Sequence, residues 1–267
     1  MTALAARRRH PLALVLLIAL GLLATGAAYS ALAPQPAQAS TASADDIAQG
    51  KKLFLANCAT CHGLNAQGGP VNDKDEIVAP SLVGVGAAAV DFQVGTGRMP
   101  MALPGPQVQE KPSQFSAEQV SQLAAFVASL APGPAVPDSE YTTGEGGDAA
   151  VGGAIFRVNC AMCHNFAGAG GALTRGKYAP SIRGVGGRYV YEAMVTGPQS
   201  MPVFNDANIT PENKRNVIAF LKTIQEEPNA SGSALGNLGP VPEGLFVWIV
   251  GIGALIGCAV WLGSKAA

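Results

Sequence analysis

A cysteine motif that occurs twice limits the fold of this chain more than any other feature. Residues 58–62 read Cys-Ala-Thr-Cys-His, and residues 160–164 read Cys-Ala-Met-Cys-His. Two thiols at this spacing can form thioethers with both vinyl groups of one porphyrin, and the next residue then places an imidazole beneath the iron. We therefore expect two covalently bound haem c groups. The expected attachment residues are Cys58, Cys61, Cys160 and Cys163, and the expected proximal iron ligands are His62 and His164.

Other chemistry fits these cysteines less well. A thioredoxin-like redox motif would lie between a strand and a helix, and neither motif follows a strand-like pattern. A zinc site needs a second pair of ligands, whereas each segment offers two cysteines and one histidine. A disulfide across two residues would be strained and would leave the histidine unexplained. A haem also supplies the apolar interior that a small, loop-rich unit lacks.

The two motifs belong to an internal duplication, because the residues around them match at an offset of 102. We expect one domain over residues 45–131 and a second over 151–228. A linker rich in proline and glycine joins them over 132–150, and another follows over 229–243. The fold class expected is all-α: in each unit one helix precedes the cysteines, another closes the unit, and long loops lie between. Ser116 with Gln119, and Thr210 followed by Pro211, are typical starts for the closing helices.

Both ends of the chain carry long uncharged stretches. Residues 12–32 follow three consecutive arginines, and residues 244–263 hold a tryptophan near each end. A helix of about 20 apolar residues spans a bilayer, so we expect a transmembrane helix over 244–263. Residues 12–32 fit either a transmembrane helix or a cleavable signal segment. Because arginines and Lys265 favour the cytoplasmic side, the chain is expected to span the cell membrane twice, with its haem domains on the extracytoplasmic side.

The second axial ligand of each iron follows from the scarcity of histidine. The chain has three histidines, of which two belong to the motifs and His10 lies beside the arginines. Bis-histidine ligation is therefore excluded, and methionine is the common partner, which raises the reduction potential. Met99 and Met201 each stand 37 residues after their motif histidine and each precedes a proline. We expect these two to be the distal ligands, with Met101 and Met194 as the alternatives.

The charge pattern excludes one class of partner. Only 13% of residues are charged and the net charge is −1, so the chain lacks the basic surface of a nucleic-acid-binding protein. Residues 45–131 hold eight acidic and five basic side chains, whereas residues 151–228 hold five acidic and eight basic ones. The opposite signs fit docking of the two units on each other, docking on different partners, or ordinary surface variation.

Residues 50–130 and 152–224 resemble class I cytochrome c domains. In that family a helix with glycine and an aromatic residue crosses a closing helix with another aromatic residue. A proline carbonyl accepts the second N–H of the proximal histidine, which orients the imidazole. The resemblance assigns the helix-crossing role to Gly50, Phe54 and Phe126 and to Gly152, Phe156 and Phe220, and the carbonyl role to Pro80 and Pro180.

Two such domains followed by a C-terminal anchor resemble the dihaem cytochrome c subunit of the actinobacterial cytochrome bc complex. The resemblance implies a subunit of a menaquinol–cytochrome c reductase that receives electrons from the Rieske iron–sulfur protein. Its implied partners are cytochrome b, the Rieske subunit and a terminal cytochrome oxidase. We expect the chain itself to carry no catalytic residue and no quinol site, because its apolar stretches lack the polar residues such a site needs.

Two other functions remain as alternatives. The chain could be the dihaem subunit of a cbb-type oxidase or a tethered electron shuttle. A dihaem peroxidase would need one iron with an open or displaceable ligand, and the equal placement of Met99 and Met201 argues against that.

Overall fold

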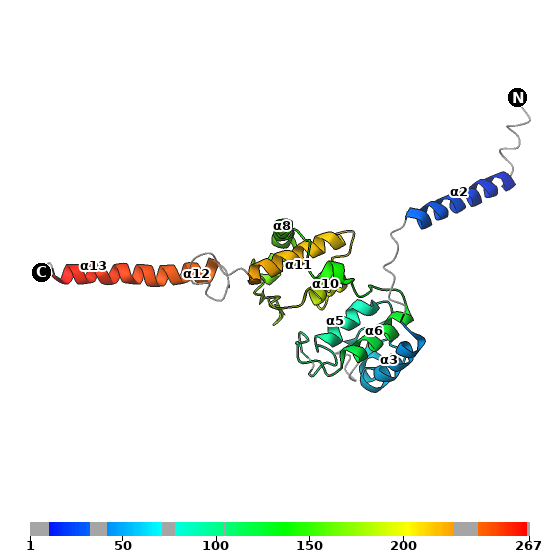
Figure 1. Ribbon diagram of the computed structural model, residues 1–267, viewed down its shortest axis with the longest axis horizontal. Coiled ribbons are helices and arrows are strands. Elements are labelled where there is room, and N and C mark those ends of the chain that lie inside the picture. The colour runs from blue at the N-terminus through cyan, green and yellow to red at the C-terminus, as the bar shows by residue number, and fades with distance from the viewer. Residues whose placement is uncertain (1–10, 33–41, 71–77, 104, 227–239, 266–267) are drawn as a thin grey trace, which may run out of the picture. The chain divides into compact units, whose positions relative to one another are not determined.

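The computed structural model describes residues 11–32, 42–70, 78–103, 105–226 and 240–265. The chain divides into two compact units, Met1–Gln38 and Ala39–Ala267. The first unit contains helix α2 (Pro11–Leu32), and the second contains the other elements. Helices dominate the described residues (Figure 1), and strands are short, so the expected all-α class is confirmed.

An apolar helix forms near each end of the chain. Within α2, Leu12–Tyr29 has a mean hydropathy of 2.3. The C-terminal segment comprises α12 (Pro240–Val247), the π-helical turn η2 (Trp248–Ile252) and α13 (Gly253–Lys265), and Val241–Lys265 has a mean hydropathy of 2.4. Neither segment is buried within the protein, and a helix that is apolar on all sides needs an apolar environment. The described residues thus contain two candidate membrane-spanning helices, as the uncharged stretches predict.

The first domain is built on two crossing helices, α3 (Ala44–Asn57) and α6 (Ala117–Leu130). At the crossing, Gly50 lies so close to the Gln122 carbonyl group that an added Cβ would overlap it. One turn further along α3, the Phe54 and Phe126 rings pack with their centroids 5.2 Å apart. Both rings are buried, and they anchor the apolar core of this domain.

The second domain repeats this crossing with α8 (Ala149–Asn159) and α11 (Pro211–Glu226). Gly152 meets the Asn216 carbonyl group in the same way. The Phe156 and Phe220 rings lie 5.4 Å apart, and their planes make an angle of 45°, the same angle as in the first domain. The helix-crossing residues implied by the family resemblance therefore occupy equivalent places in both copies.

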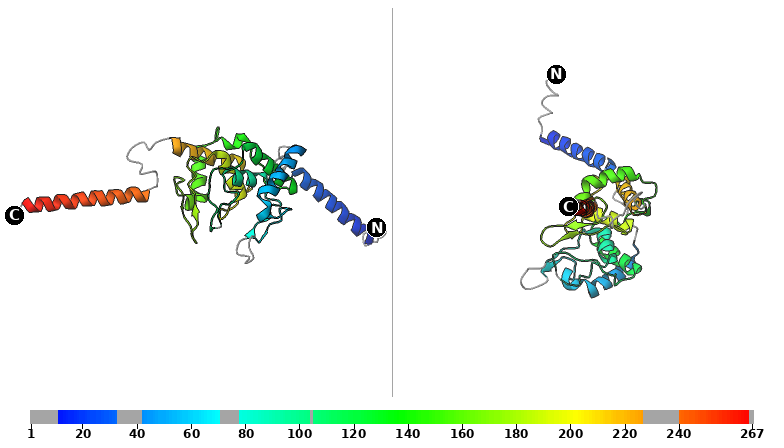
Figure 2. Two further views of the ribbon diagram at one scale, coloured as in Figure 1. Left: turned by 90° about the horizontal axis from the view of Figure 1, so that it is seen from below. Right: turned by 90° about the vertical axis from the view of Figure 1, so that its left-hand side faces the viewer.

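Shorter elements complete each domain. Two-residue strands form a hairpin in each: β1 (Gly69–Pro70) pairs antiparallel with β2 (Val78–Ala79), and β3 (Gly171–Ala172) with β4 (Tyr178–Ala179). A third helix follows the hairpin, α5 (Gly86–Gly95) in the first domain and α10 (Gly187–Thr196) in the second. The one-turn helices are α4 (Ala59–His62), α7 (Ser139–Thr142) and α9 (Ala161–His164). Figure 2 shows the two domains, with α3 and α6 in one and α11 in the other.

The expected helix starts are confirmed, and the expected long loops are partly wrong. Ser116 caps α6 in a full capping box with Gln119, and the Thr210 hydroxyl accepts the Asn213 N–H at the start of α11. Helices α5 and α10 occupy stretches that were expected to be loops. In α5 most residues are buried, polar Asp91 included, so the helix presents no amphipathic repeat to detect.

Candidate haem sites

Each cysteine motif forms a tight turn between two helices. Cys58 ends α3 and begins α4, and its carbonyl accepts N–H bonds from Cys61 at 3.2 Å and His62 at 2.9 Å. Cys160 does the same in the second domain, accepting from Cys163 at 3.1 Å and His164 at 2.9 Å. This one-turn helix holds both thiols and the imidazole of a motif close together, as attachment to one porphyrin requires.

Burial keeps the first thiol of each motif protonated. It raises the pKa of Cys58 and of Cys160 to about 11, with a smaller contribution from the neighbouring motif thiol. All the cysteines of the described residues are free thiols. The two motif thiols of each domain are therefore available for thioether formation.

The two motif histidines are oriented by proline carbonyls. The Nδ1 atom of His62 lies 2.9 Å from the Pro80 carbonyl oxygen, and that of His164 lies 2.9 Å from the Pro180 oxygen. A carbonyl can only accept a hydrogen bond, so each Nδ1 carries the proton and donates it. The lone pair of each neutral imidazole is then on Nε2, the nitrogen that can ligate iron.

A glycine just before each hairpin allows the proline segment to approach. Gly68 and Gly170 have positive φ angles of 72° and 83°. Their N–H groups donate to the His62 and His164 carbonyls at 2.8 and 2.9 Å. A Cβ at Gly170 would lie 2.5 Å from the Ala179 oxygen and 2.8 Å from the Ser181 nitrogen. A side chain here would push away the loop that holds the imidazole.

The second domain contains a cavity of about 500 Å³, within the range of cofactor pockets. Both motif cysteines, His164, Pro180 and both candidate methionines line it, together with apolar side chains such as Val190, Val217 and Leu221. Met194 is almost completely buried and Met201 is half-buried. Thiols, one oriented imidazole and a thioether in one apolar cavity are the donor set that haem c requires, so these residues fit the group.

Met99 lies in a braced loop of the first domain. Its side chain is half-buried and packs against the core around Phe54, and its N–H donates to the Gln93 carbonyl at 2.8 Å. The Lys111 ammonium donates to the carbonyls of Gly97 and Pro100, on either side of Met99. Met101 is half-exposed on the same loop. Sequence reasoning missed Lys111, because nothing in the local pattern links it to a residue twelve positions earlier.

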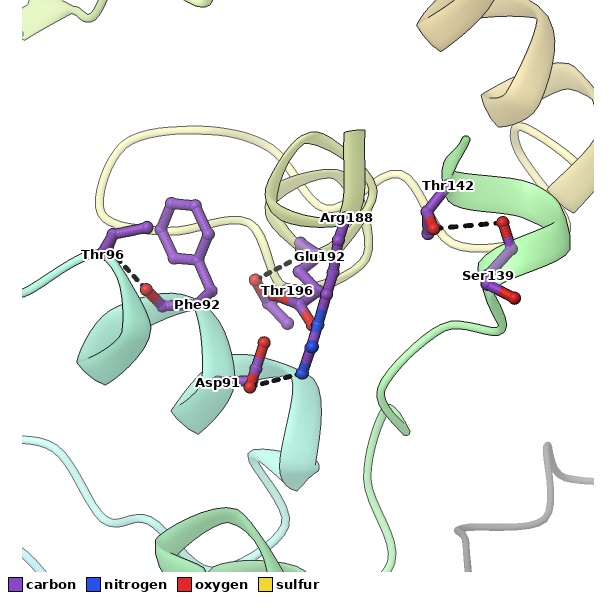
Figure 3. A network of polar contacts seen from close by, with 8 residues as sticks. All are labelled: Asp91, Phe92, Thr96, Ser139, Thr142, Arg188, Glu192 and Thr196. Carbon is purple, nitrogen blue, oxygen red and sulfur yellow. Dashed lines mark hydrogen bonds and ion pairs between the residues drawn. The ribbon is translucent and has the colours of Figure 1, made fainter. Parts of the chain in front are cut away.

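Sequence reasoning also missed a contribution of the first domain to the second cavity. Among the described residues, five of its side chains line that cavity: Phe92, Thr96, Arg98, Gln107 and Glu110. Helices α5 and α10 pack together beside it, joined by an Arg188–Asp91 ion pair of 2.6 Å (Figure 3) and an edge-on contact between Phe92 and Tyr189. The internal duplication does not predict this contact, because matching the residues of two copies does not indicate how the copies pack against each other.

Comparisons with known proteins find a family match in each of two segments of the chain. Residues 47–131 match the model of the cytochrome c family, and residues 147–221 match that of cytochrome c oxidase, cbb3-type, subunit III. The chain is 42% identical to the cytochrome bc1 complex cytochrome c subunit of Corynebacterium efficiens, over 97% of this chain and 90% of the relative. The corresponding subunit of Mycobacterium tuberculosis is also 42% identical, over 97% of this chain and 92% of the relative.

Similarity to oxidase subunits is more limited. The cbb3-type cytochrome c oxidase subunit FixP of Rhizobium etli is 33% identical over 44% of this chain and 39% of its own length. The relatives from Corynebacterium and Mycobacterium, by contrast, extend across both domains and both apolar ends.

Proposed function

The chain belongs to the family of cytochrome c subunits of the cytochrome bc1 complex, and from this premise we propose a two-haem electron path through it. One haem c is attached at Cys58 and Cys61, and the other at Cys160 and Cys163. Electrons enter from the Rieske iron–sulfur protein and leave to a terminal cytochrome oxidase. Cytochrome b is the third proposed partner, and menaquinol is oxidised there, so this chain contributes electron transfer and no quinol site.

The observation that carries the proposal is the matched pair of histidine sites. In both domains the motif histidine donates its Nδ1–H to a proline carbonyl, with 2.9 Å between Nδ1 and the oxygen, so Nε2 is the nitrogen that would bind haem iron. Bound haem supplies an iron that accepts and releases one electron. The protein residues orient the imidazole, exclude water through buried apolar side chains and offer a thioether as second ligand. Met99 and Met201 are proposed for that ligand, with Met101 and Met194 as alternatives.

The two apolar helices support the proposed location. With both spanning the cell membrane, α2 and the C-terminal segment Val241–Lys265 tether the haem domains at one surface. We assign this surface to the extracytoplasmic side, because arginines precede α2 and Lys265 ends α13. A tethered donor meets membrane-bound partners at high effective concentration.

Haem number is tested on the purified full chain by mass spectrometry under denaturing conditions. Two covalent haem masses are expected, and replacing Cys160 and Cys163 by serine should remove one of them. A chain that carries a single haem before substitution would contradict the proposal.

The distal ligands are tested by absorption spectroscopy of the oxidised protein. Met201→Ala should abolish the methionine–iron charge-transfer band of one haem, and Met99→Ala that of the other. Met162→Ala is the matched control, since Met162 lies within a motif but is 89% exposed. Loss of the band in Met194→Ala with an intact band in Met201→Ala would assign the ligand to Met194 instead.

The complex is tested by affinity purification of the tagged chain in mild detergent. Cytochrome b and the Rieske subunit should purify with it. A preparation that contains a cbb-type oxidase core and lacks cytochrome b would overturn the assignment.

A further inference from the structure

The cavity of the second domain has a wall made by the first domain. This wall comprises the five side chains Phe92, Thr96, Arg98, Gln107 and Glu110. Phe92 and Thr96 come from the end of α5, and the other three come from the loop that follows it. The proposed haem site of the second domain is therefore completed by its neighbour.

Specific contacts hold this wall in place. The Gln199 side chain pairs twice with the Val108 backbone, accepting its N–H at 2.9 Å and donating to its carbonyl at 3.0 Å. The Gln107 side chain accepts the Tyr178 N–H at 2.8 Å. Both contacts join the loop of the first domain to segments of the second that themselves line the cavity. Hydrogen bonds between glutamine side chains and backbone groups thus fix the wall across the domain boundary, in addition to apolar contact.

Arg98 is the charged residue of this wall with the most buried side chain. The residue is 8% exposed, and its guanidinium stacks on the Phe92 ring with 4.8 Å between Cζ and the ring centroid. One terminal nitrogen donates to Glu110 at 3.3 Å, but the Glu110 side chain is 61% exposed. A guanidinium has five N–H donors, and among the described residues Glu110 is the one acceptor of this group. Such a buried cation on a cavity wall suits a planar carboxylate partner.

The carboxylates that a haem brings into a protein are its two propionates. We propose that Arg98 is a cross-domain positioning residue, which binds a propionate of the haem attached at Cys160 and Cys163. This inference rests on the proposed function, since it needs a haem in this cavity. In the part of the chain that the structure describes, Arg183 is the other arginine that lines the cavity, and it belongs to the second domain itself.

The position of Arg98 in the chain links the proposed propionate contact to the first haem site. Arg98 directly precedes Met99, the proposed iron ligand of the first domain. One short loop then carries a ligand of the first haem and a propionate contact of the second. The same peptide segment thereby connects the two redox centres, and the docking of the domains helps to set the potential of the second haem.

The test is an optical redox titration of the full-length, haem-loaded protein in the Met201→His background. A second histidine lowers the potential of the second haem and so separates its signal from that of the first. In this background Arg98→Gln should lower the potential of the second haem further, because loss of a nearby cation favours the oxidised iron. Arg98→Lys should restore part of the shift.

Two further variants complete the design. Arg157→Gln is the matched control, because Arg157 is exposed on α8 and its removal changes the net charge equally. Glu110→Gln removes the exposed partner of Arg98 and should raise the potential of the second haem, which keeps the test valid if Arg98→Gln fails to fold. The proposal is overturned if only the first haem responds, or if Arg157→Gln has an equal effect. A chain with no haem at Cys160 and Cys163 would instead refute the proposed function.

Discussion

Replacing Glu192 with glutamine should stabilise the protein at neutral pH and remove one source of its pH dependence. Glu192 lies on α10, is fully buried and faces Asp91 of α5 across the domain boundary (Figure 3). One arginine serves both carboxyl groups: Arg188 lies 2.6 Å from Asp91 and 3.3 Å from Glu192. One oxygen of each carboxyl group is buried with no hydrogen-bond partner among the described residues. A proton on Glu192 would supply the missing donor between them.

The size of the effect follows from the pKa of Glu192. Burial, with the neighbouring Asp91 carboxylate as the second cause, raises this pKa from 4.5 to about 9. In the unfolded chain the group releases its proton near pH 4.5, whereas the folded chain keeps it until about pH 9. Stability therefore falls as the pH rises through this window, by ~1.4 kcal/mol per pH unit. At pH 7 the cost approaches ~3 kcal/mol.

Glutamine keeps the shape of a protonated glutamate, offers an N–H donor in place of its O–H donor, and has no proton to lose. Glu192→Gln should therefore match the wild type near pH 5 and exceed it by up to ~3 kcal/mol at pH 7, or ~6–12 °C in melting temperature. The assay is thermal unfolding of the haem-loaded protein between pH 5 and 8, followed at the Soret band. Exposed Glu226→Gln on α11 is the control. Parallel pH profiles for the wild type and Glu192→Gln would show that Glu192 is ionised and refute the reasoning.

Two glycine substitutions test the framework of each haem site. Gly152→Ala places a Cβ against the Asn216 carbonyl group and should push α8 away from α11, which lowers the free energy of unfolding by ~1–3 kcal/mol. Ala154→Ser on the exposed side of α8 is the control. Equal melting temperatures for the two variants would contradict the close approach of the helices at Gly152. Gly170→Ala adds both strain at a φ of 83° and a clash with the Pro180 loop, costing ~1–3 kcal/mol and shifting the haem potential. Gly186→Ala is the control, because Gly186 has open space around it, and it should change neither the stability nor the haem potential. An unchanged haem potential in Gly170→Ala would show that this glycine does not help to orient the histidine.

The local signals of the sequence predicted local structure well. The capping residues Ser116 and Thr210 start helices where expected, because a side chain that satisfies the first N–H groups acts within four residues. The crossing glycines and aromatic rings follow the family resemblance, since both copies keep the same close approach.

Features that depend on docking of the copies escaped prediction. Asp91 and Glu192 lie on helices that the sequence pattern does not mark, and their pairing is visible only when α5 meets α10. No sequence pattern marks Arg98 as buried, and its burial becomes visible only in the folded structure. The opposite charges of the two segments were consistent with docking, and the Arg188–Asp91 pair is one contact of that kind.

The pairing of α5 with α10 has a consequence for how a duplicated protein can diversify. Each of these helices follows the hairpin of its own copy, so the domain boundary joins equivalent elements, as two-fold association of identical copies does. In such a dimer every substitution appears in both copies at once, so an acidic residue on the two-fold axis faces the same acidic residue of the other copy and is repelled by it. Once the copies are joined in one chain, each side can change alone. An acidic Asp91 can then face a basic Arg188, and a single cavity can draw its walls from both halves.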